Sequence, residues 1–240
     1  MDAARARLAI GLVDLTNLQD RCTHDDVDRL CARAAEAGTA AVCVWPDFVA
    51  QASAALVDSG VDVATVVNFP TGDERPYAVR AVTERVVADG ADDVDVVLPY
   101  RAYLVGDVAW CAALLDGVRA ETDGRAHLKV ILETGELGDT DTMTAAARFA
   151  IDHGADFVKT STGKSPVSAT NDSVGALLTA ISAADRTVGL KPSGGISSAE
   201  TADAYLAQAE AVMGGDYLHA ATFRFGASGV LDALIAAAAD

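Results

Sequence analysis

Lysine is scarce in this sequence, and one lysine occupies a position where a charged side chain is costly. There are four lysines, Lys129, Lys159, Lys164 and Lys191, against fourteen arginines. The segment from Phe157 to Ser161 reads as a short strand, so the Lys159 amine is expected where a core side chain belongs. A desolvated amine without its proton is a nucleophile that forms imines with carbonyl compounds. Lys159 is therefore the first candidate catalytic residue.

Lys191 and Asp95 lie in two other apolar runs and are candidates for the same site. Side chains alternate between faces along a strand, so Lys159, Lys191 and Asp95 meet in one interior if their faces turn inward. One carboxylate does not neutralise two lysines, and both burial and like charge then favour the uncharged form of one amine. The alternative is that Lys191 and Asp95 form a purely structural ion pair. The many polar residues in neighbouring runs favour the catalytic interpretation.

Other residues in these runs are expected to support the catalytic groups. Asp14 and Thr16 belong to the first run, and Lys129 lies in the fifth. Cys43 lies in the second run, and Thr160 directly follows Lys159. The four cysteines have no CxxC pairing and the four histidines no HExxH pattern, so we predict reduced, buried thiols, no metal and no cofactor.

Three glycine- and serine-rich segments after the last three runs suggest an anion site. They could present backbone N–H groups, hydroxyls and one lysine to a phosphate. The candidate binding residues are Gly163, Lys164, Gly194, Gly195, Gly226 and Ser228. Alternatively, any one of these glycines could only make a tight turn, but three such loops together favour binding. A nucleotide-binding P-loop is excluded because Val158 stands where the motif requires glycine.

Eight apolar, β-branched runs recur along the chain, each followed by a helix-like segment, which is typical of βα units around a parallel sheet. Eight units predict an α/β fold with a single (β/α)8 TIM barrel, in which residues 1–240 form one catalytic domain. Thr23 and Asp26 resemble a capping signal for the first helix of the repeat, and Gly38 is expected to end it. The runs are 12–16, 41–45, 63–69, 93–98, 128–133, 157–161, 188–191 and 222–225.

The overall charge limits the partners of this protein. The formal net charge is -17 and the pI is near 4.4, so a phosphate backbone would be repelled and nucleic acid is excluded. An anionic ligand then needs a local positive site. No apolar run is long enough to span a bilayer and no secretion signal is recognised, which predicts a cytoplasmic location. The acidic excess also fits a hypothesis of adaptation to high salt.

Long motifs in this sequence resemble those of deoxyribose-phosphate aldolases, which are class I aldolases on a TIM barrel. The resemblance covers nearly the whole chain. It includes Asp93-Val94-Asp95-Val96-Val97-Leu98-Pro99-Tyr100 and Gly154-Ala155-Asp156-Phe157-Val158-Lys159-Thr160-Ser161-Thr162-Gly163-Lys164. Gly189-Leu190-Lys191-Pro192-Ser193-Gly194-Gly195-Ile196 and Phe223-Arg224-Phe225-Gly226-Ala227-Ser228 also belong to it.

This resemblance implies a reaction and roles for three residues. Lys159 would form the Schiff base, while Lys191 and Asp95 would handle protons. The implied reaction is the reversible cleavage of 2-deoxy-D-ribose 5-phosphate into D-glyceraldehyde 3-phosphate and acetaldehyde, without a metal. The partner would be a small sugar phosphate, and barrels of this type also suggest a possible homodimer.

Three departures from the family pattern concern the phosphate end of the site. Ser197 stands where members can carry arginine, Gly229 where they can carry serine, and the C-terminal tail has no tyrosine. A looser preference for the phosphorylated substrate is therefore expected. Two alternatives stay open: a related Schiff-base aldolase with a different or non-phosphorylated substrate, and a non-catalytic barrel that binds sugar phosphates.

Overall fold

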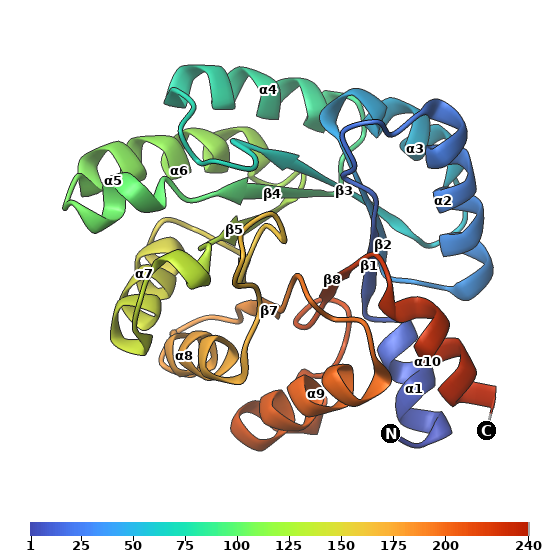
Figure 1. Ribbon diagram of the computed structural model, residues 1–240. Coiled ribbons are helices and arrows are strands. Elements are labelled where there is room, and N and C mark those ends of the chain that lie inside the picture. The colour runs from blue at the N-terminus through green and yellow to red at the C-terminus, as the bar shows by residue number, and fades with distance from the viewer. Residues whose placement is uncertain (240) are drawn as a thin grey trace.

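The computed structural model describes residues 1–239 and has eight parallel strands surrounded by helices (Figure 1). Hydrogen-bonded neighbours follow the order β7-β6-β5-β4-β3-β2-β1-β8. Isolated bridges between Leu190 and Phe223 and between Ser193 and Gly226 join the two ends of this series. The predicted (β/α)8 barrel is therefore confirmed.

Short strands alternate with longer helices along the chain. The strands are β1 (Val13–Thr16), β2 (Ala41–Val44), β3 (Asp62–Val67), β4 (Asp93–Val97), β5 (His127–Ile131), β6 (Phe157–Lys159), β7 (Gly189–Lys191) and β8 (Phe225–Ala227). The α-helices are α1 (Ala3–Ile10), α2 (His24–Ala37), α3 (Val49–Ala55), α4 (Pro76–Ala88), α5 (Tyr100–Leu104), α6 (Val108–Thr122), α7 (Thr140–Asp152), α8 (Asn171–Ser182), α9 (Ala199–Met213) and α10 (Val230–Ala239). Three 3-10 turns complete the described elements: η1 (Pro46–Phe48), η2 (Thr134–Glu136) and η3 (Gly215–Tyr217).

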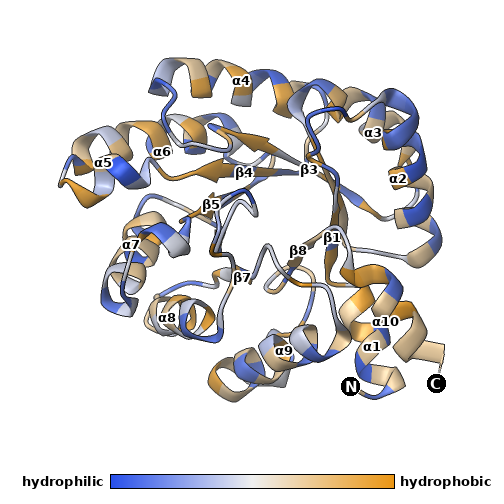
Figure 2. Cartoon of the chain, viewed as in Figure 1, coloured by the Kyte–Doolittle hydropathy of each residue, from blue (hydrophilic) through white to orange (hydrophobic). Residues whose placement is uncertain are grey.

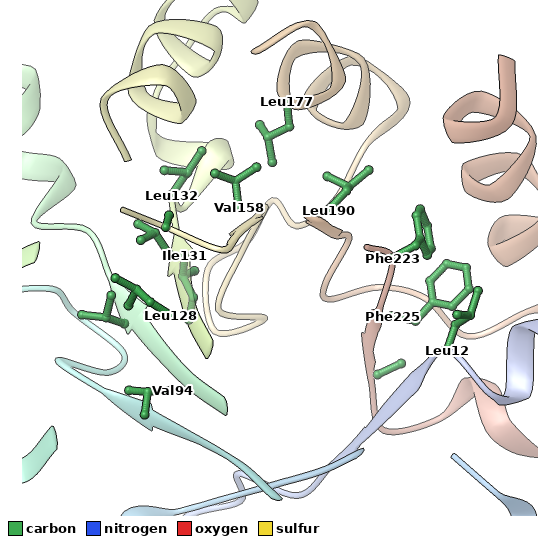
Figure 3. Packing of buried hydrophobic residues seen from close by; sticks show 14 of the residues in the cluster. Leu12, Val94, Leu128, Ile131, Leu132, Val158, Leu177, Leu190, Phe223 and Phe225 are labelled. Atoms are coloured by element: carbon green, nitrogen blue, oxygen red, sulfur yellow. The ribbon is translucent and has the colours of Figure 1, made fainter. Parts of the chain in front are cut away.

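The main hydrophobic core lies between the strands and the helices. Apolar residues follow the strands and the inner sides of the helices, whereas the loops are hydrophilic (Figure 2). Val158 of β6, Leu190 of β7 and Leu177 of α8 belong to this layer (Figure 3). Because strand side chains alternate, the residues next to these apolar ones turn into the barrel. The barrel interior can therefore hold polar chemistry without interrupting the core.

The helix signals seen in the sequence are present in the structure. Thr23 and Asp26 form a reciprocal capping box at the start of α2, and Gly38 ends it in the left-handed conformation. Helices α1 and α10 lie side by side and link the two ends of the chain (Figure 1). Within residues 1–239, no helix is both long and apolar enough to cross a bilayer.

The eight predicted runs each correspond to a strand, but the last one is displaced. Residues 222–225 were expected to form it, whereas β8 begins at Phe225. Regular pairing with β1 starts there, opposite Val13, and the preceding residues meet β7 only through the Leu190–Phe223 bridge. Apolar residues alternate with others both in the predicted run 222–225 and in β8. The start of the strand therefore depends on pairing partners that the sequence does not reveal.

Phe157 and Gly189 form a tightly packed pair inside the barrel. They are register partners in β6 and β7, and both are buried. A Cβ atom added at Gly189 would overlap the Phe157 ring. The ring also carries Lys129 Nζ 5.1 Å from its centroid, so it cannot shift without disturbing a buried cation.

We expect Gly189→Ala to lower the free energy of unfolding by about 1–3 kcal/mol, because the added methyl group overpacks this pair. Gly117→Ala is the matched control, since Gly117 lies in α6 and a Cβ there would come no closer than 3.9 Å to the Arg80 side chain. It should raise stability by up to about 1 kcal/mol. Urea unfolding measures both, and equal effects of the two substitutions would contradict the packing argument.

Candidate active site

One carboxylate oxygen lies at the centre of the barrel and is shared by two lysines. Asp95 Oδ2 is 2.7 Å from Lys159 Nζ and 2.7 Å from Lys191 Nζ. Lys191 and Asp95 are fully buried, and Lys159 is 3% exposed. The structure thus brings together the three residues that the sequence singled out.

The barrel register places these side chains. Lys159 and Lys191 are register partners at the ends of β6 and β7, and Asp95 extends inward from β4. Their neighbours Val158 and Leu190 belong to the outer apolar core. Two amines meet because parallel strands keep equivalent positions on the same face of the sheet.

Lys191 has a second carboxylate partner. Asp14 Oδ2 in β1 lies 2.5 Å from Lys191 Nζ, so the assumption of a single carboxylate for two lysines was wrong. Burial opposes the charge on Lys191, but Asp14 and Asp95 outweigh it and raise the pKa of its amine. Lys191 is therefore a firmly held ammonium group, whereas Lys159 contacts only the shared oxygen.

Arg224 is a member of this cluster that sequence reasoning missed. Its Nη1 lies 2.9 Å from Asp14 Oδ1 and its Nη2 lies 2.9 Å from Asp62 Oδ2. Burial lowers the pKa of the guanidinium less than Asp14 and Asp93 raise it, so Arg224 is a permanent cation here. Its alternation with Phe223 and Phe225 was the sequence signal that could have revealed an inward-facing charge.

Lys129 belongs to the base of the cluster. Its amine contacts Asp93, which also lies 3.1 Å from His127 Nδ1 and 3.7 Å from Arg224 Nη1. The Asp93 hydrogen bond raises the pKa of His127. Lys129 therefore supports the site through Asp93 and the Phe157 ring, below the shared oxygen of Asp95.

The ion network around Asp95 has more fully buried bases than fully buried acids; Glu133 is a further buried acid outside it, bound to Thr162, and Asp62 is a partly exposed acid bound to Arg224. Within residues 1–239, the fully or almost fully buried ionic side chains of this network include three acids, Asp14, Asp93 and Asp95. The matching bases are Lys129, Lys159, Lys191 and Arg224. An excess base in a desolvated interior is the condition under which one amine loses its proton most readily.

A cavity of about 380 Å³ opens at the carboxyl ends of the strands. All six predicted anion-binding residues line it: Gly163, Lys164, Gly194, Gly195, Gly226 and Ser228. A Cβ at Gly226 would come within 3.2 Å of Lys191 Cε, so this glycine connects the cavity with the lysine cluster. Lys159 itself is not among the residues that line the cavity.

The glycines of this rim permit close approach between neighbouring loops. A Cβ at Gly194 would lie 3.0 Å from Gly163 Cα and would overlap Ser168. Gly163, Gly194 and Gly195 also have positive φ angles. The close contact between the loops after β6 and β7 therefore requires glycine at position 194, and the positive φ angles favour glycine at all three positions.

Lys164 spans the mouth of the cavity. Its Nζ donates a hydrogen bond of 2.8 Å to the Leu18 carbonyl oxygen and lies 3.7 Å from Asp20. The loop that carries it is held from below by Glu133, which accepts hydrogen bonds from the Thr162 backbone and hydroxyl. The structure thus places Lys164 at the predicted rim, with its amine directed to the loop after β1.

The remaining supporting residues have different surroundings. Thr160 links the end of β6 to the next loop through hydrogen bonds with the Ser193 backbone. Thr16 lines the cavity, and its hydroxyl donates to the Asp14 carbonyl oxygen. Cys43 packs in a small interior cluster with Leu18, Ala41, Ala64 and Val66, and burial raises the pKa of its thiol to about 11.

No described group of three His, Cys, Asp or Glu residues in 1–239 has an arrangement suited to a metal ion. The absence of a metal or cofactor from the reaction stays a prediction. What the geometry offers directly is two amines on one carboxylate, next to a cavity lined by glycine-rich loops. This arrangement can support covalent chemistry on a small carbonyl compound that carries an anionic group.

The fold and site define a (β/α)8 barrel with a buried lysine pair suited to imine chemistry. Residues 8–231 match the model of the DeoC/LacD family aldolase, and this chain belongs to that family. It is 49% identical over 230 residues to a deoxyribose-phosphate aldolase of Agrobacterium fabrum, covering 95% of this chain and 89% of the relative.

Solved structures agree with this assignment. A protein of Toxoplasma gondii ME49, provisionally named a deoxyribose-phosphate aldolase, superposes with a TM-score of 0.89 at 27% identity, covering 99% of this chain and 96% of that one. A tetrameric deoxyribose phosphate aldolase of Aeropyrum pernix gives a TM-score of 0.78 at 24% identity, covering 98% and 96%. The second likeness shows the shared fold alone.

The buried carboxylates should make the protein sensitive to acid. Lysine and arginine partners overcome the effect of burial and lower the pKa of Asp14, Asp93 and Asp95. A depressed pKa contributes stability that is present above the unfolded value, near 4, and is lost as the pH falls below it.

We therefore expect Asp93→Asn to be less stable than the parent by about 3 kcal/mol or more at pH 7. This gap should narrow by about 1 kcal/mol per pH unit below about pH 4, because only the parent gains the proton on unfolding. Urea unfolding between pH 7 and pH 3 measures the gap. Asp123→Asn, at a side chain that is 85% exposed, should follow the parent throughout. A gap that is independent of pH would contradict the assigned charge of Asp93.

Proposed function

We propose that this protein is a deoxyribose-phosphate aldolase that uses Lys159 as its Schiff-base residue. The reaction is the reversible cleavage of 2-deoxy-D-ribose 5-phosphate into D-glyceraldehyde 3-phosphate and acetaldehyde. The observation that carries this proposal is the sharing of Asp95 Oδ2 by the Lys159 and Lys191 amines. The sequence identity of 49% to a relative of that name supports the substrate.

The chemistry follows from an amine that forms an iminium ion. The Lys159 nitrogen attacks the C1 aldehyde of the open-chain sugar, and loss of water leaves the iminium. The C3 hydroxyl then loses its proton as the C2–C3 bond breaks, and the electron pair of that bond moves toward the iminium. This releases D-glyceraldehyde 3-phosphate and leaves an enamine on Lys159.

The enamine then gains a proton at C2, and water hydrolyses the resulting acetaldehyde imine. Beside the Lys159 nitrogen, Asp95 is the carboxylate that accepts hydrogen bonds and Lys191 is the ammonium group that donates one, so we assign acceptance and donation of these protons to them, with a water as the carrier. Hydrolysis returns Lys159 to the free amine. The iminium supplies the electron sink throughout, and each step is balanced by groups of this chain and water.

The different surroundings of the lysines support Lys159 as the nucleophile. Lys191 contacts both Asp14 and Asp95, and this raises the pKa of its amine. Lys129 is enclosed by Asp93 and Phe157, with no exposure. Lys159 has one shared carboxylate contact and retains slight exposure, at the carboxyl end of β6.

The residues that line the cavity support binding of a phosphorylated substrate, but with a weaker preference for the phosphate group. Gly163, Gly195 and Ser228 line the cavity and have backbone N–H groups, with one hydroxyl, for an anion. The N–H groups of Gly194 and Gly226 instead donate to the carbonyl oxygens of Gly226 and Pro192. Ser197 and Gly229 also line the cavity, and neither supplies a positive charge. These two residues favour the second candidate function, in which a related non-phosphorylated aldehyde sugar is also accepted.

The same proposal includes a cytoplasmic location and the possible homodimer suggested by the barrel class. Its four cysteines are free, which suits a reducing compartment.

Borohydride reduction in the presence of acetaldehyde tests the covalent step. We expect a stable adduct on Lys159, located by peptide mass mapping, because borohydride reduces the imine to a secondary amine. Lys159→Leu should form no adduct and should lose at least about a thousandfold in kcat/KM, whereas the matched control Lys164→Leu should still be labelled at Lys159. Labelling at another lysine, or labelling that persists in Lys159→Leu, would overturn the assignment.

The phosphate preference can be measured as the ratio of kcat/KM for 2-deoxyribose 5-phosphate to that for 2-deoxyribose. We expect a ratio below roughly a thousandfold, the effect of about three charge-assisted hydrogen bonds. Ser197→Arg should raise this ratio by about tenfold, since it adds a cation to the cavity lining. Val57→Arg adds the same charge at a side chain that is 68% exposed after α3, and should leave the ratio unchanged. A parent ratio of many orders of magnitude would contradict the weaker preference for the phosphate group.

A further inference from the structure

Arg224 is a buried cation whose place in the barrel the proposed reaction does not yet explain. It is 3% exposed and precedes β8. Its neighbours Phe223 and Phe225 belong to the outer core and lie near Leu190 and Leu12 (Figure 3). Alternation along the chain therefore turns the Arg224 side chain inward, toward the lysine cluster.

Arg224 contacts strands that lie far from it in the sequence. It binds Asp14 of β1 and Asp62 of β3 at 2.9 Å each, and it lies 3.7 Å from Asp93 of β4. Its Nε also donates to the Ala220 carbonyl oxygen. Asp62 is the only one of the three acids with substantial exposure, at 42% of its side chain.

A continuous series of contacts joins this guanidinium to the Schiff-base candidate. One oxygen of Asp14 faces Arg224 and the other faces Lys191, at 2.9 and 2.5 Å. Lys191 then contacts Asp95, which contacts Lys159. Arg224 does not line the cavity. It can therefore act on the reaction only indirectly, through its contact with Asp14 and through its charge.

We propose that Arg224 is a positioning residue for the aldol reaction: it fixes Asp14 against Lys191 and adds the positive charge that favours the free amine of Lys159. This inference rests on the proposed function of Lys159. Its physical basis is that an arginine stays charged at all relevant pH values, whereas a lysine in the same place can lose its proton. Arg224 keeps its proton, so an amine that becomes free in this network belongs to a lysine.

The charged groups around this network come from six strands. Arg224 faces Asp14, Asp62 and Asp93, and Asp93 in turn holds Lys129 and His127. Lys191 faces Asp14 and Asp95, with Lys159 and the Cys43 thiol nearby. His127 is 54% exposed and meets Arg224 only through Asp93, so its titration has to be separated from that of the Schiff-base amine. The effect of Arg224 is therefore read as a difference between pH profiles.

A purely structural role for Arg224 makes a different prediction. If it only ties β8 to β1 and β3, its loss lowers stability and activity at every pH. If it acts through charge, its loss changes the pH at which the Schiff-base amine becomes free. Removing its partner Asp62 must then act in the opposite direction, because Arg224 is left with one fewer compensating anion.

The experiment is the pH profile of kcat/KM for 2-deoxyribose 5-phosphate in the full chain. Arg224→Met should move the acid limb to higher pH by about one unit, and Asp62→Asn should move it to lower pH by a fraction of a unit. Arg224→Lys supplies a positive charge as long as its amine is protonated, which Asp14, Asp62 and Asp93 favour, and it should restore most of the parent position of the acid limb. Asp156→Asn removes a comparable partner from Arg119 at the same end of the barrel and should leave the limb in place.

The proposal would be overturned if the acid limb of the pH profile stays in place in both Arg224→Met and Asp62→Asn. It would also be overturned if the limb moves in the same direction in both variants. If Arg224→Met does not fold, the direction of the Asp62→Asn shift decides, because Asp62 is partly exposed and tolerates an isosteric amide. Borohydride labelling of the parent with acetaldehyde distinguishes a failure of the proposed role of Arg224 from a failure of the proposed function. Labelled Lys159 with unshifted limbs refutes only the role of Arg224, whereas an unlabelled parent refutes the proposed function.

Discussion

Two amines share a single carboxylate oxygen in this barrel, and the surrounding structure depends on that arrangement. Asp95 Oδ2 lies 2.7 Å from both Lys159 and Lys191, in an interior almost without solvent. Buried charges are costly unless they are paired and hydrogen-bonded, so further partners are needed. Asp14 and Arg224 provide them on one side, and the shared oxygen leaves Lys159 as the least compensated member.

The location of the hydrophobic core makes this interior possible. Apolar side chains on the outer faces of the strands pack against the helices and carry most of the burial. Small residues such as Gly189, Ala41 and Ala64 leave space inside the barrel for long charged side chains. The stability of the fold and the chemistry of the site are thus built from opposite faces of the same strands.

The two ends of the interior are closed in different ways. At the carboxyl end, glycines in the loops after β6, β7 and β8 let the backbones approach one another around a cavity. Toward the other end, the Phe157 ring, Lys129 and Asp93 fill the barrel. A substrate can therefore reach the lysine pair only from the carboxyl ends of the strands, as is usual in this fold.

The sequence by itself determined the eight repeating units, the inward faces and the residue types of the site. Period-two alternation is local information, and lysines within apolar runs are visible without coordinates. Only the tertiary structure decided that Asp14 is the second partner of Lys191, that Arg224 belongs to the cluster and that Lys164 reaches the Leu18 carbonyl. It also placed β8 at Phe225. These features depend on register and barrel closure between strands far apart in the chain, where no local pattern specifies which side chains meet.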